Sequence, residues 1–381
     1  MWIERHLREK LIAHLIPGKV LVLYWPRQIG KTSLVKQILV ESFSQEKILS
    51  VSGEDRDVAK IFSSQSSTLL WNTLQWYSLL FIDEAQKIEN IGLNLKIIVD
   101  TFPMIKIIVT GSSSFHLQHA FGEPLVGRKF TYTMFPIAQM EMRIFMSPIE
   151  MRRDMETRLI YGSYPEVFRE DMTNDERSRY LADIVENYLY KDILELDEIR
   201  HRRKIIDLLS LLAFQIGHEV SLSELGRSLE LSSATVDKYL YYLEESFVLF
   251  RLRGFSRNLR KEITKTCRYY FYDTGVRNAI IKNFNPLSIR NDIGMLWENF
   301  LVMERLKRQE YSISWYGNNY FWRTHDQKEI DWIEDYDGKL HAYEFKWSDK
   351  PVKVPKVFIQ NYPDSTFEVV HRDNFLDFVL E

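Results

Sequence analysis

The stretch from Tyr24 to Thr32, YWPRQIGKT, constrains the fold most because it joins an apolar run at 19–23 directly to a helical pattern at 32–43. A strand that passes into a helix through a Gly-Lys-Thr loop aims backbone N–H groups and the positive helix end at one point. Such a point suits a polyphosphate, so ATP or GTP is the first ligand to consider. The predicted loop residues are Pro26, Arg27, Gln28, Ile29, Gly30, Lys31, Thr32 and Ser33.

Two residues of this loop have the side chains that nucleotide chemistry needs. Lys31 is expected to reach the β- and γ-phosphates, and the hydroxyl of Thr32 is expected to bind Mg²⁺. Trp25 departs from the usual G-x-x-x-x-G-K-[ST] pattern, since it stands in place of the first glycine and cannot freely adopt a positive φ. Taken alone, a chance Gly-Lys-Thr at a helix start is the alternative.

A second buried strand ends in two adjacent carboxylates. Residues 79–82 form a short apolar run, which is typical of a strand in a parallel sheet, and Asp83 and Glu84 follow it. Asp83 is expected to hold Mg²⁺ through water beside the phosphates, and Glu84 to orient or polarise the attacking water. The alternative is an ordinary acidic strand end, which the neighbouring phosphate loop disfavours.

A third strand at 105–109 brings hydroxyl groups to the same sheet edge, where ligands of open α/β sheets bind. Thr110 or Ser112 is expected to sense the γ-phosphate, with capping of the following turn as the alternative.

Arg128 precedes a fourth predicted strand at 130–134, a position from which an arginine finger could reach the nucleotide of a neighbouring subunit. Because we see no use for Arg128 within one subunit, it predicts a homo-oligomer, of which a ring is one form. A surface arginine is the alternative.

The chain resembles the AAA-type ATPases of bacteria and archaea that carry a long C-terminal domain of unknown function. The resemblance extends over nearly the whole chain and rests on separate short motifs: Arg5, 26–28 with 30–32, 81–86, 110–112, 127–128, Pro136, 162–166, 273–275, 297–300 and 344–346. It implies a nucleotide-binding core, a helical lid and a DNA-oriented C-terminal half, without naming a substrate.

Composition is compatible with these implications. The chain has 381 residues, 45% of them apolar, enough for two or three globular domains. We expect a cytoplasmic protein without a membrane segment, because no apolar stretch approaches the length of a membrane span, and a single cysteine excludes an internal disulfide. The net charge of −3 gives no global attraction to nucleic acid, so DNA contacts need a local basic patch.

Changes of hydrophobic period predict an α/β fold in four parts. Residues 1–137 form a P-loop, AAA+-like parallel-sheet core, and 138–200 form its helical lid. Residues 201–285 form a winged-helix domain, and 286–381 form an α/β domain of the PD-(D/E)xK nuclease-like type.

The expected winged helix offers a DNA-binding surface. On its last helix Thr235, Lys238 and Tyr242 share one face that could enter a major groove. Basic residues of the following wing suit phosphate contacts; they are Arg253, Arg257, Arg260 and Lys261. The alternative is a module that packs against protein.

The C-terminal part contains a predicted hairpin around Asp337-Gly338, a dipeptide that favours a tight turn. A two-residue loop places Asp331 opposite Glu344, and a divalent cation between them relieves their repulsion. This region resembles the PD-(D/E)xK nuclease signature, which implies metal ligation by Asp331 and Glu344, water positioning by Lys346, and Glu298 as a further ligand. In the alternative, Lys346 forms an ordinary cross-strand ion pair with Glu329.

Two functions therefore remain open. The first is an ATP-hydrolysing, Mg²⁺-using protein that acts on DNA, with or without a nuclease activity of its own. The second is a nucleotide-gated switch that recognises a partner protein or a DNA structure, with an inactive nuclease-like domain.

Overall fold

The computed structural model describes residues 3–24, 28–111, 124–189, 202–256, 266–312, 315–324, 326–349 and 351–380. The chain divides into two compact units. The N-terminal unit comprises residues 2–136 with 245–247, and the C-terminal unit comprises 137–244 with 248–381.

The N-terminal unit is built on a parallel sheet with the strand order β2-β3-β4-β1-β5. Its strands are β1 (Val20–Tyr24), β2 (Ile48–Ser52), β3 (Leu79–Asp83), β4 (Lys106–Gly111) and β5 (Lys129–Thr133). Its helices are α1 (Leu7–His14), α2 (Lys31–Ser42), α3 (Arg56–Phe62), α4 (Ser67–Leu74), η1 (Ala85–Lys87) and α5 (Ile91–Thr101). This agrees with the predicted parallel α/β core.

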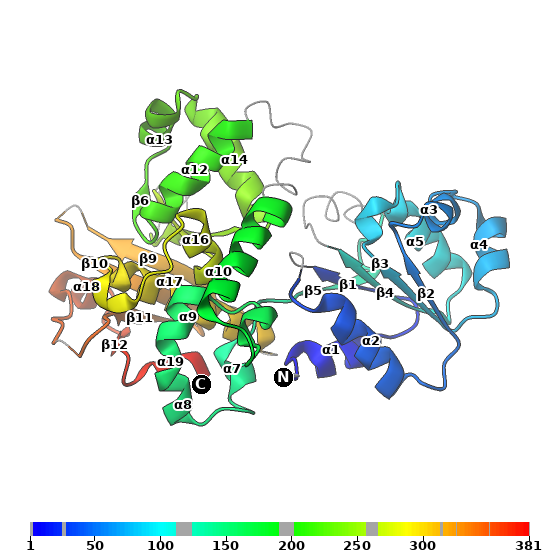
Figure 1. Cartoon of the computed structure of the whole chain (residues 1–381), viewed down its shortest axis with the longest axis horizontal. Helices are drawn as coiled ribbons and strands as arrows, with labels where there is room; N and C mark the ends of the chain where they lie inside the picture. The colour runs from blue at the N-terminus through cyan, green and yellow to red at the C-terminus, as the bar shows by residue number, and fades with distance from the viewer. Residues whose placement is uncertain are drawn as a thin grey trace. The chain divides into compact units, whose positions relative to one another are not determined.

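Both faces of this sheet are covered (Figure 1), with α1 and α2 on one side and α3, α4 and α5 on the other. Strand β1 is buried along its whole length, which explains its continuous apolar sequence. Val20 and Val22 pack in the core cluster with Leu70 of α4 and Leu95 of α5. Because β4 lies between β1 and β3, the carboxyl ends of all three strands meet at one sheet edge.

The C-terminal unit contains a mixed sheet, whose described strands follow the order β12-β11-β10-β9-β7-β8-β6. They are β6 (Glu219–Val220), β7 (Leu249–Gly254), β8 (Cys267–Phe271), β9 (Asn318–Arg323), β10 (Glu329–Tyr336), β11 (Lys339–Phe345) and β12 (Thr366–Val370). The helices before β8 are α7 (Gln139–Met142), α8 (Pro148–Arg153), α9 (Met155–Tyr161), η2 (Pro165–Phe168), α10 (Asn174–Asp183), η3 (Ile184–Leu189), α12 (Arg202–Phe214), α13 (Leu222–Leu229) and α14 (Ser233–Glu245). Those after it are α16 (Thr274–Ile280), η4 (Leu287–Ile289), α17 (Ile293–Tyr311), α18 (Lys356–Asn361) and α19 (Phe375–Leu380).

The predicted winged-helix and nuclease-like regions share this sheet. Strand β7 pairs in parallel with β9 through Arg253 opposite Tyr320 and Gly254 opposite Phe321. The expected boundary near residue 285 thus separates strands that belong to one sheet, while the helices of the predicted lid belong to the C-terminal unit. The four-part division and the role of the lid stay predictions.

Two of the motifs that carried the family resemblance join α9 to α16. The Asp273 carboxylate accepts hydrogen bonds from the backbone N–H groups of Ser163 and Val276, at 2.6 and 3.0 Å. Gly162 has a φ of +72°, and a β-carbon there would collide with this carboxylate. Thr274 donates to the carbonyl of Arg158 at 2.8 Å, so a carbonyl in the last turn of α9 has a partner at the start of α16.

Asn299 of α17 completes the hydrogen bonding of β8. Its amide oxygen accepts from the N–H of Phe271 at 2.7 Å, and its amide nitrogen donates to the carbonyl of Phe271 at 2.8 Å. The side chain is fully buried. Asn299 therefore serves the edge of β8 as a neighbouring strand would.

We predict that Asn299→Ala lowers the free energy of unfolding of the C-terminal unit by about 2–4 kcal/mol, because two buried backbone groups lose their partner. Urea denaturation, followed by hydrogen exchange of peptides that contain β8, measures the effect. The exposed Asn285 is the matched control, and Asn285→Ala should change the same quantity by less than about 0.5 kcal/mol. Equal effects of the two substitutions would contradict the role of Asn299.

Candidate functional site

The phosphate loop leads into α2 through Gly30, whose φ of +90° lies in the left-handed region that glycine adopts without strain. Lys31 and Thr32 are the first residues of α2, next to its unpaired N–H groups. Lys31 is 5% exposed and Ser33 is exposed. The helix N-terminus thus presents the two residue types that the sequence assigned to phosphate and Mg²⁺.

Arg5 anchors this loop from the segment before α1. Its guanidinium donates to the carbonyl of Ile29 at 3.0 Å and to the carbonyl of Phe135. Arg5 is only 6% exposed, and Ile29 is fully buried. Since both acceptors are backbone atoms, Arg5 holds the loop against the end of β5.

Asp83, at the end of β3, connects the start of α2 with the end of β4. Its Oδ2 accepts from the Thr32 hydroxyl at 2.8 Å, and its Oδ1 accepts from the hydroxyl of Thr110. The three side chains come from α2, β3 and the end of β4. The structure therefore brings together the predicted Mg²⁺ residues and the predicted γ-phosphate sensor.

Glu84 follows Asp83 in a left-handed conformation, with a φ of +50°. Such a conformation costs of order 1 kcal/mol for a residue with a side chain, and it recurs at functional sites. The backbone N–H of Glu84 donates to Thr110 Oγ1 at 3.3 Å, and the Gln86 amide donates to its carboxylate. Glu84 is therefore held in place from both its backbone and its side chain.

The oxygen atoms at this edge fit a magnesium ion bound with a nucleotide. Mg²⁺ in such sites takes one or two protein oxygens and completes its shell with water and phosphate oxygens. The hydroxyl of Thr32 and the carboxylate of Asp83 are already neighbours, as their hydrogen bond shows. These two residues would hold the ion.

Arg128 has a partner in its own chain. The oligomer was predicted because Arg128 had no evident use within one subunit, and this contact corrects that premise. Its Nε lies 3.1 Å from Asp100 Oδ1, and the two side chains are 40% and 47% exposed. An ion pair this exposed contributes about 0–1 kcal/mol to the stability of the fold, so Arg128 can readily leave Asp100 for another partner. The arginine-finger role stays a prediction.

Several predicted site residues lie outside the described part of the chain. They are Pro26, Arg27, Ser112, Arg257, Arg260 and Lys261, together with Trp25. Gln28 is described and has a φ of +65°.

The predicted DNA-reading face of α14 needs one correction. Tyr242 is 2% exposed, because the buried side of α14 also includes Tyr239 and Leu243. It is therefore not available to a major groove. Lys238 and Arg253 are exposed, while Thr235 is half-buried and its hydroxyl contacts that of Ser232 at 2.8 Å.

The C-terminal hairpin forms with the predicted register from Trp332–Tyr343 to Tyr336–Lys339. Both turn residues, Asp337 and Gly338, have positive φ angles, as a two-residue hairpin turn requires. The pairing of β10 with β11 begins at Trp332 and Tyr343, so Asp331 and Glu344 are not paired in the sheet as predicted. Instead, Asp331 Oδ2 accepts from the N–H of Phe345 at 2.9 Å.

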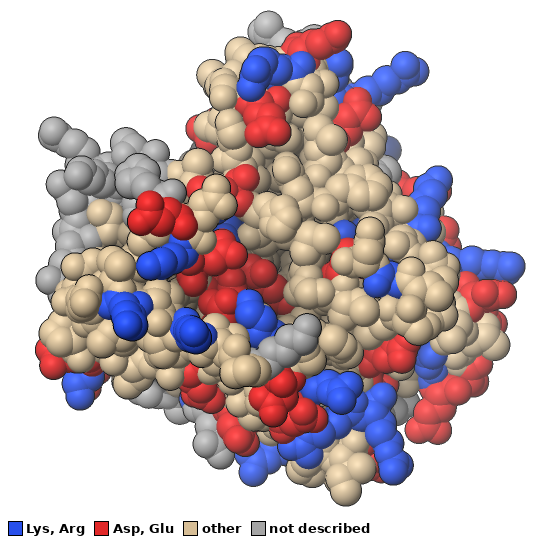
Figure 2. Space-filling view, turned by 90° about the vertical axis from the view of Figure 1, so that its left-hand side faces the viewer, with Lys and Arg blue, Asp and Glu red and all other residues tan. Residues whose placement is uncertain are grey.

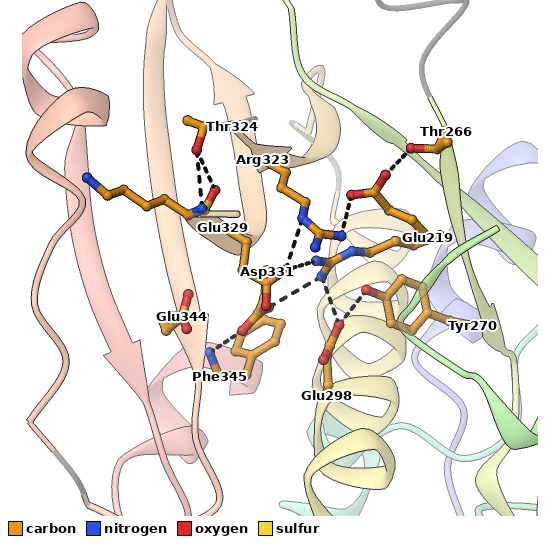
Figure 3. Close-up of polar contacts among 12 residues, drawn as sticks. Glu219, Thr266, Tyr270, Glu298, Arg323, Thr324, Glu329, Asp331, Glu344 and Phe345 are labelled. Atoms are coloured by element: carbon orange, nitrogen blue, oxygen red, sulfur yellow. Dashed lines mark hydrogen bonds and ion pairs between the residues drawn. The ribbon is translucent and has the colours of Figure 1, made fainter. Parts of the chain in front are cut away.

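The predicted nuclease-like residues gather with others in what we call the acidic cluster, formed by Glu298, Glu329, Asp331 and Glu344 (Figure 3). Glu329 does not pair with Lys346, which corrects that alternative. Lys346 Nζ lies 2.6 Å from Glu344 Oε1, whereas Glu329 Oε2 lies 2.7 Å from Arg268 Nη2.

Arg268 of β8 is bound by three of the cluster's carboxylates. Its Nη1 lies 3.3 Å from Glu298 Oε1 and 3.4 Å from Asp331 Oδ1, in addition to the contact with Glu329. The hydroxyl of Tyr270 also donates to Glu298 Oε1 at 2.7 Å. Arg268 and Tyr270 were not selected from the sequence, although an arginine within the apolar run of β8 signals a buried acidic partner.

Burial and mutual repulsion raise the pKa values of Glu298, Glu344 and Asp331. Burial, with the neighbouring Asp331 charge, raises the pKa of Glu298 to about 8 and that of Glu344 to about 7. Burial also raises the pKa of Asp331, although Arg268 opposes the shift. Near neutral pH Glu298 and Glu344 therefore tend to keep a proton, which lowers the negative charge of the cluster.

The cluster as arranged does not fit a divalent cation. Within the described ranges, no group of three or more His, Cys, Asp or Glu side chains is placed to hold a metal ion. The guanidinium of Arg268 lies between Glu298 and Asp331, two of the predicted ligands. We therefore derive no metal-dependent cleavage step from this region.

None of the helices in the described part of the chain has both the length and the apolar character needed to cross a membrane.

Three family models match successive parts of the chain. Residues 17–143 match an AAA domain, which supports an AAA-type ATPase. Residues 152–287 match the domain of unknown function DUF8612, and residues 293–373 match the domain of unknown function DUF4143. The C-terminal domain of unknown function that the resemblance implied is therefore present.

Two relatives with similar sequences are described as uncharacterised proteins. One from Methanocaldococcus jannaschii is 24% identical over 398 residues, which cover 94% of this chain and 86% of that protein. Another, from Mycobacterium tuberculosis, is 24% identical over 357 residues, which cover 92% of this chain and 76% of that protein.

Among solved structures, the replication initiator DnaA bound to AMPPCP and single-stranded DNA is 15% identical, with a TM-score of 0.33 over 63% of this chain and 86% of that one. AMPPCP-bound DnaA from Aquifex aeolicus is also 15% identical, with a TM-score of 0.34 and the same coverage. Likeness at these TM-scores supports no conclusion on function.

We predict that the C-terminal unit loses stability as pH rises from about 5 to about 8, in buffer with EDTA. A raised pKa means that the folded chain binds the proton more tightly than the unfolded chain, so unfolding becomes easier once that proton leaves. The Glu298 side chain is 17% exposed. At about 1.4 kcal/mol per pKa unit, the rise of its pKa corresponds to a change of a few kcal/mol at most in the free energy of unfolding. Glu298→Gln should flatten the profile, as measured by urea denaturation at several pH values.

The exposed Glu310 on the same helix is the matched control, and Glu310→Gln should keep the wild-type slope. A wild-type stability that rises across this pH range would contradict the prediction.

Proposed function

We propose that this protein binds and hydrolyses ATP as an AAA+-like, oligomeric ATPase that acts on or recognises DNA. The observation that carries the proposal is the contact of Thr32 and Thr110 with the same carboxylate, Asp83, beside the N-terminus of α2. The match of residues 17–143 to an AAA domain supports it.

Each residue of the site has a distinct part in this proposal. Lys31 and the N–H groups at the start of α2 bind the phosphates, and Gly30 lets the backbone turn toward them. Glu84 accepts a proton from the attacking water, or orients that water. Thr110 links the γ-phosphate side of the site to Asp83 and Glu84. Mg²⁺, when bound with ATP, neutralises charge on the β- and γ-oxygens.

The DNA part of the proposal rests on the basic residues of the winged-helix region, of which Lys238 and Arg253 are exposed. Phosphate contacts by lysine and arginine give binding that weakens with salt and depends little on sequence. On the face drawn in Figure 2, Lys and Arg side chains are interspersed with Asp and Glu side chains.

A second candidate is a nucleotide-gated switch whose C-terminal unit binds a partner protein or a DNA structure without cutting it. The observation that favours it is Arg268, which contacts Glu298 and Asp331 in the place where the nuclease signature needs a metal. ATP turnover stimulated by DNA favours the first function, whereas slow turnover indifferent to DNA favours the switch.

We predict that Lys31→Ala abolishes detectable ATP turnover, whereas Glu84→Gln keeps nucleotide binding and slows hydrolysis by about 10²–10⁴-fold, the usual contribution of a general base. Phosphate release and binding of a fluorescent ATP analogue measure the two properties. The exposed Lys36 on the same helix is the control, and Lys36→Ala should retain turnover. Wild-type turnover in both site variants would remove the proposed site.

We further predict that single-stranded, duplex or junction DNA raises ATP turnover, and that the double substitution Lys238→Ala/Arg253→Ala reduces this stimulation. Added salt should weaken it as well, because phosphate contacts release counterions. Lys353 and Lys356, both exposed, provide a control of equal charge change. Turnover unaffected by any DNA would favour the switch.

A further inference from the structure

The acidic cluster contains more negative charge than its immediate cations can balance. Glu298, Glu329, Asp331 and Glu344 supply four carboxylates. Among the described residues, Arg268 and Lys346 pair with them, and Arg323 Nε lies 4.0 Å from Glu329 at the rim. At its rim Glu219 and Arg323 pair with each other at 2.8 Å, so they add no net charge. When all four carboxyl groups are ionised, the formal excess is two negative charges, which equals the charge of one divalent cation.

Arg268 lies deep within this cluster. Its side chain is 4% exposed, and its guanidinium carbon is 4.7 Å from the centre of the Phe321 ring. Strand β8 directs it toward the carboxylates of α17 and β10, which supply Glu298 and Asp331. Figure 3 shows that Glu298, Asp331 and Glu329 converge from these separate elements.

One carboxylate oxygen of the cluster has no hydrogen-bond partner among the residues that the structure describes. It is Glu344 Oε2, which is buried, whereas Oε1 of the same group contacts Lys346. A buried carboxylate oxygen without a donor is costly, and either a bound cation or a proton on the group relieves that cost.

Geometry decides what can occupy the space between the carboxylates. A divalent cation needs carboxylate oxygens at roughly 2.0–2.6 Å. The guanidinium of Arg268 already contacts both Glu298 and Asp331, at 3.3 and 3.4 Å, and carries the same sign of charge as the metal. Arginine and metal therefore compete for the same oxygens.

We propose that Arg268 is the resident cation of the acidic cluster, that it excludes divalent metal ions from it, and that loss of the Arg268 side chain converts the cluster into a divalent-cation site. The inference does not depend on nucleotide binding.

The test measures Mn²⁺ binding to the full chain by the loss of the free Mn²⁺ signal in electron paramagnetic resonance, without nucleotide. All proteins carry Asp83→Asn, which removes the carboxylate of the N-terminal site. With Arg268 present, we expect dissociation constants no tighter than about 1 mM, the weak limit of protein cation sites. Arg268→Met should tighten binding at least about tenfold, and adding Glu344→Gln should reverse the gain.

Two further variants separate charge from packing. Arg268→Lys keeps a cation in the cluster and should show no gain in Mn²⁺ binding. Arg251→Met removes an arginine of β7 whose partners are Glu244 and Cys267, outside the cluster, and should show none either. If Arg268→Met does not fold, Arg268→Gln takes its place, because glutamine can still hydrogen-bond to the carboxylates.

Tight Mn²⁺ binding with Arg268 in place, abolished by Glu344→Gln, would overturn the proposal. So would a folded Arg268→Met or Arg268→Gln protein that binds Mn²⁺ no better than the unsubstituted cluster.

Discussion

The carboxylate of Asp83 is the interaction on which the N-terminal site depends. It accepts hydrogen bonds from two hydroxyls, one on Thr32 at the start of α2 and one on Thr110 at the end of β4. A carboxylate with two donors is strongly held. The strand order makes this arrangement possible. Because β4 lies between β1 and β3, Thr110 at the end of β4 lies beside Asp83 at the end of β3. The site is thus assembled by the sheet and not by any one loop.

The C-terminal unit is organised by buried polar side chains in a comparable way. Asp273 and Asn299 satisfy backbone groups of other elements, and Arg268 holds carboxylates from α17 and β10. Buried charges of this kind are costly unless they are paired, so each fixes the position of its partners. Several motifs shared with the resembled family, among them 162–166 and 273–275, therefore have a structural explanation that needs no catalytic role.

The sequence was sufficient for the parallel sheet and for most of the first site, because apolar runs, Gly30 and the Asp83-Glu84 pair are local signals. It was also sufficient for the hairpin, whose turn residues determine the register. The sequence was insufficient where the partner of a side chain lies far away along the chain. Arg268 is 63 positions from Asp331, Asp100 is 28 positions from Arg128, and no local pattern links either pair. Tyr242 was misplaced because the buried side of α14 is wider than a simple heptad stripe.

Calorimetric titration of the folded wild-type chain with a non-hydrolysable ATP analogue and Mg²⁺ tests the central claim most directly. The account predicts a saturable heat of binding that requires the metal. The absence of any heat at two temperatures, from protein shown to be folded, would contradict it.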